Sequence, residues 1–258
     1  MICDSHAHLH HAAAFDADRA AVLERARAAG VGVILDVATT PEDAPLVVAL
    51  AARETDLFAA VGIHPHEAER ATPAAIAGLA ALTAAPRVVA WGEIGLDYHY
   101  MHAARPTQRE AFAAQLAAAA VARLPASVHS RAADADTVEL LAAHAGAERG
   151  VIHCFSGDAA FAAACLDLGF YLSFSGILTF RSADALRAVA AGVPEDRLLV
   201  ETDSPFLAPA PRRGGRNEPA RVAEVLAVLA AVRGTDVSRL AERTTANFFA
   251  LFRRAAVA

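Results

Sequence analysis

Lysine is absent from this chain of 258 residues, and cysteine and aromatic residues are few. All 23 basic side chains are therefore arginine, which we attribute to codon usage rather than to mechanism. The three cysteines are odd in number and their spacing is not that of a disulfide scaffold, so a reducing compartment, the cytoplasm, is expected. Aromatic residues make up 6% of the chain, and no stretch of alternating basic and aromatic residues indicates a nucleic-acid stacking surface.

An excess of positive charge and a long apolar run are also missing. The formal net charge is −6, which argues against a protein that grips long duplex DNA electrostatically. An enzyme that holds one or two phosphates through metal ions stays possible, because bound metals supply charge that residue counts omit. Polar side chains interrupt the alanine-rich stretches before the roughly 20 apolar residues of a membrane span. We expect no secretory signal and no membrane association, and nothing indicates an obligate protein partner.

Short apolar runs alternate with alanine-rich stretches of helical spacing along the chain. The eight runs predict strands at residues 1–6, 31–38, 57–64, 88–95, 126–130, 150–155, 170–175 and 198–203. Helical spacing is clearest in 17–29, 107–122 and 134–144. Eight strand–helix units predict an α/β fold, a (β/α)8 TIM barrel, and residues 1–258 have a suitable length for one such domain.

Side chains that bind metals recur where these predicted strands end. His6 and His8 are two residues apart on an extended segment, so both rings point to the same face and can reach one ion. Because the active site of such a barrel lies at the carboxyl ends of its strands, ligands from several strands should meet there. The six candidates are His6, His8, Glu93, His129, His153 and Asp203. Any one alone could be a buried structural residue, but their shared position favours a metal site.

Six candidate ligands are more than one tetrahedral zinc site needs. Two divalent ions about 3.5–4 Å apart that share a carboxylate would use all of them. Glu93 lies between the first histidine pair and the later two histidines in strand order, so we predict that it bridges the ions. Asp203 is predicted to bind metal and to take a proton from water as general base.

The segments that carry these residues resemble the TatD family of metal-dependent deoxyribonucleases, within the amidohydrolase-like barrels. The matching segments are 4–9, 62–66, 92–98, 129–131, 153–157, 201–209, 216–219 and 245–249. They cover essentially the whole chain in the family's order, and 92–98 and 201–207 are the most specific. The chain departs from the family pattern at Gly215, where a basic residue is expected, and in the histidine-rich segment 99–102.

The resemblance implies a ligand set and an activity. One ion would be held by His6, His8, Glu93 and Asp203, and the second by Glu93, His129 and His153. Asp203 would be the catalytic base, and His64 would contact a substrate phosphate. The ions would be Mg, Mn or Zn, and the reaction would be hydrolysis of DNA phosphodiester bonds, often from 3′ ends of single strands. Two alternatives stay open: a dinuclear hydrolase of a small ester, lactone or amide, and a non-catalytic metal-binding scaffold.

Residues around these ligands allow further expectations. Arg131 could bind phosphate, because a guanidinium group matches phosphate oxygens, and the arginines of segment 211–217 could either do the same or lie on a solvated surface. Asp97 and Glu201 are expected either to orient ligating histidines or to have a structural role. Tyr98 is expected to pack structurally rather than to stack on a base. Cys154 should face away from the site as a buried, inert thiol.

Overall fold

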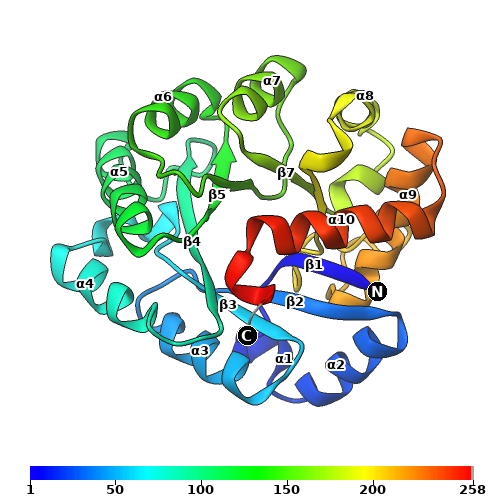
Figure 1. Cartoon of the computed structure of the whole chain (residues 1–258), viewed down its shortest axis with the longest axis horizontal. Coiled ribbons are helices and arrows are strands. Elements are labelled where there is room, and N and C mark those ends of the chain that lie inside the picture. Colours follow the sequence, from blue (N-terminus) through cyan, green and yellow to red (C-terminus); the bar gives the residue numbers. More distant parts are fainter. Residues whose placement is uncertain (257–258) are drawn as a thin grey trace.

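Eight parallel strands form a barrel in the order β1 to β8 in this computed structural model, which describes residues 1–256 (Figure 1). The strands are β1 (Ile2–Ala7), β2 (Val31–Val37), β3 (Leu57–Val61), β4 (Val88–Asp97), β5 (Ala126–Arg131), β6 (Gly150–Ile152), β7 (Tyr171–Phe174) and β8 (Leu198–Val200). All eight predicted strands are confirmed. Three of them, β3, β6 and β8, end three residues before the predicted end. Beyond β6 and β8 the backbone turns into the left-handed region at Cys154 and Asp203, which ends the extended conformation.

Helices surround the barrel between successive strands, as Figure 1 shows. They are α1 (Ala12–Phe15), α2 (Arg19–Ala28), α3 (Asp43–Arg53), α4 (Pro73–Leu82), α5 (Arg105–Ala122), α6 (Asp134–His144), α7 (Ala159–Asp167), α8 (Asp184–Gly192), α9 (Val222–Arg233) and α10 (Val237–Leu251). Short 3₁₀ helices are η1 (Pro65–Arg70), η2 (Gly176–Thr179), η3 (Glu195–Arg197), η4 (Pro219–Arg221) and η5 (Arg253–Ala256). The strands are buried on both faces because helices cover them outside and side chains fill the barrel inside.

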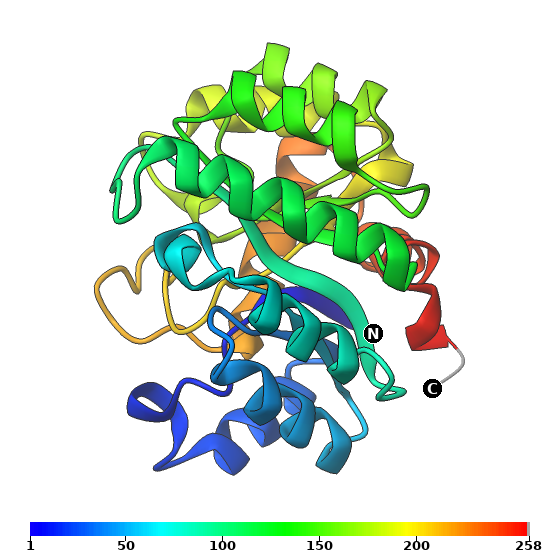
Figure 2. The same cartoon turned by 90° about the vertical axis from the view of Figure 1, so that its left-hand side faces the viewer.

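The amino-terminal end of the barrel is closed by α10 and η5. Phe248 and Phe252 are fully buried there and belong to one apolar cluster with inward-facing strand residues such as Leu35 and Leu199. Figure 2 shows this closed end on the right, and the long loops that follow the strands project on the left. An open site can therefore form only at the carboxyl ends of the strands, as the barrel predicts.

The seam between β1 and β8 depends on the segment that follows β8. An isolated parallel bridge joins Ala7 to Ser204, beyond the end of β8, and the N–H of Asp203 donates to the carbonyl of His6 at 2.9 Å. The buried carboxylate of Asp4 accepts hydrogen bonds from the backbone N–H of Thr202 at 2.9 Å and from its hydroxyl at 2.6 Å. Burial raises the pKa of Asp4 to about 8, although the bonds from Thr202 oppose this shift. The seam fixes the backbone immediately before Asp203.

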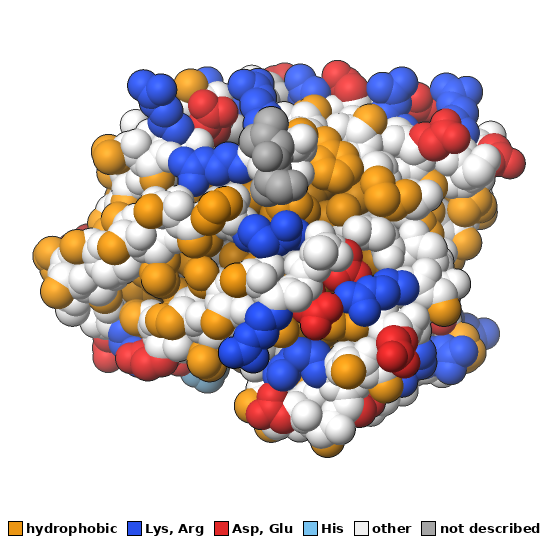
Figure 3. All heavy atoms as spheres, turned by 60° about the horizontal axis from the view of Figure 1, so that its bottom comes forward, with side chains coloured by type: hydrophobic (Ala, Val, Ile, Leu, Met, Phe, Trp, Pro, Cys, Tyr) orange, Lys and Arg blue, Asp and Glu red, His pale blue; other side chains and the backbone are white. Residues whose placement is uncertain are grey.

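The surface carries mixed charge. On the face that Figure 3 shows, Arg side chains alternate with Asp, Glu and apolar side chains, without a continuous basic area. This agrees with the net charge of −6. Across residues 1–256, none of the helices combines the length and apolar character that crossing a membrane would require.

Candidate metal centre

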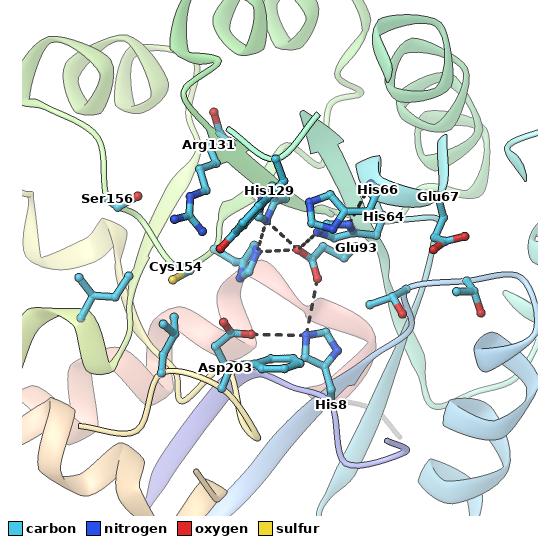
Figure 4. Close-up of a pocket in the computed structure, with 18 of the residues that line it drawn as sticks. His8, His64, His66, Glu67, Glu93, His129, Arg131, Cys154, Ser156 and Asp203 are labelled. Carbon is cyan, nitrogen blue, oxygen red and sulfur yellow. Dashed lines mark hydrogen bonds and ion pairs between the residues drawn. The ribbon is translucent and has the colours of Figure 1, made fainter. Parts of the chain in front are cut away.

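A pocket of about 720 Å³ lies at the carboxyl ends of the strands. Its walls include seven of the eight residues that the sequence singled out: His8, His64, Glu93, His129, Arg131, His153 and Asp203. The eighth, His6, is fully buried beneath them. Figure 4 shows His8, His64 and His129 pointing towards Glu93 from different strand ends. The structure thus brings together residues that are up to about 200 positions apart in the chain.

Glu93, on β4, lies at the centre of the group, and its two carboxylate oxygens face different histidines (Figure 4). Oε2 is 3.3 Å from Nε2 of His6 and 3.7 Å from Nε2 of His8. Oε1 is 2.8 Å from Nε2 of His153 and 3.0 Å from Nδ1 of His129. Burial favours a neutral carboxyl, but the surrounding imidazoles outweigh it and hold the pKa of Glu93 well below its ordinary value. One ionised carboxylate therefore faces two separate pairs of imidazoles.

Asp203 joins the pair formed by His6 and His8. Its Oδ1 is 3.4 Å from Nε2 of His8 and 4.0 Å from Nε2 of His6. Burial would raise the pKa of Asp203, but the contacts with these histidines outweigh it and keep the pKa below its ordinary value. The backbone of Asp203 has φ of 56°, a conformation that non-glycine residues adopt rarely and that is common at functional sites.

In each histidine ring, the contact made by the nitrogen that points away from the centre determines whether the inward nitrogen carries a proton or a lone pair. Three of these outer nitrogens lie beside oxygens that can only accept a proton: Val37 O for His8 at 2.7 Å, Asp97 Oδ2 for His129 at 3.2 Å and Glu201 Oε1 for His153 at 3.3 Å. In a neutral ring the outer nitrogen then carries the proton, and the inner nitrogen offers a lone pair. The expectation that Asp97 and Glu201 orient histidines is confirmed by these contacts.

His64 differs from those histidines. Its Nδ1 accepts a hydrogen bond from the backbone N–H of His66 at 3.1 Å, so in the neutral ring the proton lies on Nε2. That Nε2 is 3.3 Å from Oε1 of Glu93. Burial lowers the pKa of His64 to about 4, although the charge of Glu93 opposes this. His64 is therefore a neutral hydrogen-bond donor towards the centre, and it offers no inward lone pair.

The arrangement fits bound cations. Nδ1 of His129 and Nε2 of His153 are 3.3 Å apart. When both rings are neutral their lone pairs repel each other. Burial lowers the pKa of both histidines, but the nearby carboxylates outweigh it and raise both values, so a positive charge, from a proton or a metal ion, is favoured here. Nε2 of His6 and Nε2 of His8 are 3.2 Å apart, and the outer Nδ1 of His6 lies 3.3 Å from Oγ of Ser127, a hydroxyl that can donate or accept. Ligand atoms lie within 4.8 Å of one another in the groups His6/His8/Asp203 and His6/Glu93/His153. A third group, His64/Glu93/His129, is equally compact, but the proton on Nε2 of His64 makes that residue a hydrogen-bond donor rather than a ligand. Mixed imidazole and carboxylate donors suit zinc and manganese in particular.

Two glycines of β4 explain why the strand can carry Glu93 so close to β5. A Cβ atom on Gly95 would lie 2.0 Å from the carbonyl oxygen of His129, and φ of Gly95 is 140°. A Cβ atom on Gly92 would lie 2.6 Å from Cβ of Ser127. Any side chain at these positions would force β4 away from β5, which carries His129.

Two buried glutamines of α5 fix the backbone beside the centre, and sequence analysis missed them. Gln115 accepts from the N–H of Ile63 at 2.8 Å and donates to its carbonyl at 2.9 Å. Gln108 does the same for Asp97, at 2.8 and 3.0 Å. The two glutamines are seven residues apart, two helical turns, on the face of α5 that packs against the barrel. Two amides at this spacing among alanines are a pattern that could have revealed them.

Asn217 belongs to one of the segments that resemble the TatD family, and in the structure it holds the backbone of a turn. It is fully buried, and its Nδ2 donates to the carbonyl of Thr202 at 2.9 Å and to that of Phe206 at 2.7 Å. Its own N–H donates to the carbonyl of Pro205 at 2.9 Å. Asn217 therefore holds both sides of the turn that carries Asp203.

The expected direction of Cys154 is wrong, whereas the expected inert thiol agrees with its environment. The thiol lines the pocket, and its Sγ lies 3.1 Å from Oγ of Ser175. Side-chain alternation predicts the opposite face, but β6 ends at Ile152 and the φ of 45° at Cys154 breaks the alternation. Burial, together with the charges of Asp203 and Glu201, keeps the pKa of this thiol well above its ordinary value, so the thiol stays protonated.

The arginines of segment 211–217 lie outside the pocket lining. Arg212 and Arg216 form ion pairs with Glu224 and Asp18, and Arg213 lies over the ring of Phe180. All three arginines are exposed, which agrees with the alternative that they lie on a solvated surface. The expected structural packing of Tyr98 is confirmed, because its hydroxyl donates to Asp136 at 2.6 Å and Arg105 covers its ring.

A (β/α)8 barrel with converging imidazoles and carboxylates at the open end of its strands is the architecture of a metal-dependent hydrolase. The family model described as "TatD related DNase" matches residues 3–253. The chain therefore belongs to the TatD family of metal-dependent hydrolases.

Individual relatives agree with this assignment. The chain is 40% identical over 255 residues to the uncharacterized metal-dependent hydrolase YabD of Bacillus subtilis (strain 168), covering 98% of this chain and 99% of that protein. It is 36% identical to the 3'-5' ssDNA/RNA exonuclease TatD of Klebsiella pneumoniae (strain 342), covering 92% and 93%. The crystal structure of the TatD homolog YjjV from Escherichia coli K12 superposes with a TM-score of 0.92 at 33% identity, over 98% of each chain.

Proposed function

We propose that this protein is a cytoplasmic deoxyribonuclease that removes nucleotides from the 3′ end of single-stranded DNA by metal-dependent hydrolysis of phosphodiester bonds. The observation that carries the proposal is the position of Glu93, whose two oxygens face two separate imidazole pairs. A bridging carboxylate between two cations is the arrangement that phosphodiester hydrolysis favours. The relative from Klebsiella that is named a 3'-5' ssDNA/RNA exonuclease supports the choice of substrate.

Two divalent ions, Mg, Mn or Zn, would occupy the centre. His6, His8, Glu93 and Asp203 would hold one of them, and Glu93, His129 and His153 the other. When bound, such ions neutralise charge on the phosphoryl group and make a water more acidic. The protein's part is to supply ionised carboxylates and inward lone pairs in a fixed arrangement, which the outer contacts at Asp97 and Glu201 maintain.

Asp203 is the general base in this proposal. Its carboxylate is ionised because its pKa is held below the ordinary value, so it can accept a proton at neutral pH. Its side chain is 13% exposed and borders the pocket, where water has access.

His64 and Arg131 would bind the phosphate. His64 offers a neutral N–H towards the centre, which suits an anionic phosphoryl oxygen. Arg131 lies at the wall of the same pocket, and its exposed guanidinium group can donate two parallel hydrogen bonds to phosphate.

The test is cleavage of single-stranded DNA by protein that has first been stripped with a chelator and then supplied with Mg, Mn or Zn separately. A 5′-labelled strand should give a ladder of successively shorter products, and a 3′-labelled strand should release labelled mononucleotide from the start. The Asp203→Asn variant and the stripped protein are the controls, and bound metal is counted by mass spectrometry.

Each result has a definite meaning. A ladder that needs both added metal and Asp203 supports the proposal and identifies a competent ion. Failure to cleave DNA with any metal, although two ions bind per chain, contradicts the nuclease and directs the search to lactones, amides and small esters. Failure to turn over any of these substrates favours a metal-binding scaffold.

A further inference from the structure

Two large aromatic side chains are half exposed at the mouth of the pocket. Tyr100 is 54% exposed and Phe206 is 50% exposed, and both line the pocket that contains the metal centre. Most aromatic rings of this size in the chain are buried, including Phe15, Phe112, Phe155 and Phe174. Aromatic rings that line a pocket and stay exposed are available to contact a ligand bound there.

The two rings lie on opposite sides of the centre. Tyr100 follows β4 and Phe206 follows β8, and these strands are four places apart in a barrel of eight, which puts them across the mouth from each other. Phe206 is next to His8, with ring centroids 6.0 Å apart. Tyr100 is next to His66, with centroids 5.6 Å apart, on the side where His129 lies. The metal centre is therefore between them.

Tyr100 is held from behind by polar and aromatic groups. The guanidinium group of Arg131 lies 4.8 Å from the centroid of its ring. The rings of His66 and His102 stack with their centroids 4.3 Å apart, and each of them makes an edge-to-face contact with Tyr100. His66 is fixed in turn by Asp97, with Nε2 and Oδ2 2.9 Å apart. The ring is thus supported while half of its surface stays open.

Phe206 is fixed through its backbone. Its carbonyl accepts a hydrogen bond from the buried Nδ2 of Asn217 at 2.7 Å, and its N–H donates to the carbonyl of Asp203 at 2.8 Å. The position of this ring is therefore coupled to that of Asp203. An exposed ring on a fixed backbone is suited to stacking because little ordering is needed when a flat partner binds.

We propose that Tyr100 and Phe206 are two stacking platforms that bind the nucleobases on either side of the phosphodiester bond to be cut. The inference rests on the proposed nuclease function and extends it to the bases. Every nucleobase offers a flat π face, so stacking binds single strands with little regard for sequence. It also explains how a chain with a net charge of −6 can hold a polyanion, because stacking needs no basic surface.

The sequence has no run of alternating basic and aromatic residues, so its pattern predicts no stacking surface. The two rings are isolated from each other in the sequence, and each stands in a different loop. Only the closed barrel brings those loops to one pocket.

The test measures kcat and KM for single-stranded oligonucleotides with the variants Tyr100→Leu and Phe206→Leu. Leucine keeps apolar bulk but removes the π face. We expect KM to rise between about five-fold and a hundred-fold, the range typical of one lost stacked base, while kcat changes little. Tyr100→Phe and Phe206→Tyr, which keep a ring, should restore most of the lost affinity. Met101→Ala changes a neighbouring side chain that is 42% exposed and outside the pocket lining, and it should behave as wild type.

Removing the base from the DNA provides the decisive comparison. Oligonucleotides with an abasic analogue at the terminal or at the next position remove one stacking partner at a time. The wild-type protein should bind each abasic oligonucleotide more weakly than intact DNA. A leucine variant has already lost one ring, so removing the base that this ring would contact should not weaken its binding any further. Metal content of every variant is measured alongside, so that a loss of metal next to His8 is recognised.

The outcomes separate the two proposals. Variants that match wild type on intact DNA overturn the stacking inference and leave the nuclease standing. Equal losses on intact and abasic DNA indicate that the rings only support the loops, which also overturns it. Wild-type protein that cleaves no DNA with restored metal contradicts the proposed function, and the stacking inference with it.

Discussion

At the scale of the residue, the chemistry of the centre is decided by what each histidine touches on its outer side. Rings that donate outward, as His129 does to Asp97 and His153 to Glu201, present lone pairs inward. His64 accepts on its outer side from the backbone of His66 and therefore presents a proton. The group beside the outer nitrogen of each histidine selects its tautomer. His129 and His153 are therefore candidate metal ligands, whereas His64 is a candidate hydrogen-bond donor.

Removing the general base Asp203 or the central carboxylate of Glu93 should abolish turnover. For Asp203→Asn we expect a fall in kcat of roughly 10²- to 10⁴-fold, the usual contribution of a general base. Glu93→Gln should reduce activity at least as much and should also lower the number of ions bound, because one oxygen becomes a neutral amide. Activity, metal content and thermal unfolding are measured on the same preparations. A folded Asp203→Asn variant with full activity is incompatible with the proposed mechanism.

Loss of an orienting carboxylate should weaken metal binding rather than the fold. Glu201→Gln leaves His153 without a charged acceptor, and we expect metal affinity to fall about 10- to 100-fold. Titration against a competing chelator measures this. Glu69→Gln removes the same charge from an exposed position and is the matched control. Equal affinity in both variants would contradict the orienting role.

At the scale of the element, buried amides attach neighbouring segments to the strand ends. α5 contributes Gln108 and Gln115, which bind the backbone of Asp97 and Ile63, and the segment after β8 is held by Asn217. The strands are short, three residues for β6 and for β8, so these attachments determine where the chain goes next. Each amide satisfies backbone groups that would otherwise be buried without partners.

Asn217→Ala should damage both stability and the site. It leaves the carbonyls of Thr202 and Phe206 without a partner, and we expect the free energy of unfolding to fall by about 1–3 kcal/mol. Because the released turn carries Asp203, metal affinity should fall as well. Urea denaturation with and without metal measures the two effects. A variant with reduced stability and unchanged metal affinity would show that Asn217 does not position Asp203.

At the scale of the whole molecule, the barrel has one closed end and one functional end. Apolar side chains from α10 and η5 fill the amino-terminal end, while ionisable groups gather at the carboxyl end, where the loops are long (Figure 2). Apolar packing at the closed end can therefore be weakened without touching the groups that would do the chemistry. Changes at the two ends should have separable effects.

Phe252→Ala should destabilise the fold and leave the chemistry intact. The side chain is fully buried in the apolar cluster at the closed end, so the free energy of unfolding should fall by about 3–5 kcal/mol. At temperatures where the variant is folded, kcat should equal that of wild type. Thermal unfolding and activity assays on the same sample check this, and a large fall in kcat of the folded variant would contradict the separation of the two ends.

Metal removal should act on the whole molecule through mass action. An ion that binds only the folded chain stabilises it by about 4 kcal/mol when the free concentration of the ion is a thousand times its dissociation constant. A chelator should therefore lower the unfolding temperature, and added Mg, Mn or Zn should restore it. In the variant Glu93→Gln the chelator should have a smaller effect. The same unfolding temperature with and without metal in wild type would contradict a metal centre in this pocket.

The sequence by itself determined the eight strands and the region where ionisable side chains gather. Apolar periodicity is a local property, and in a parallel barrel the end of each run predicts which residues reach the mouth. The tertiary structure decided the tautomers of His64 and His129, the inward position of Cys154 and the pairing of Tyr100 with Phe206 across the pocket. Each of these depends on contacts or backbone turns between segments far apart in the chain, and such contacts exist only once the barrel has closed.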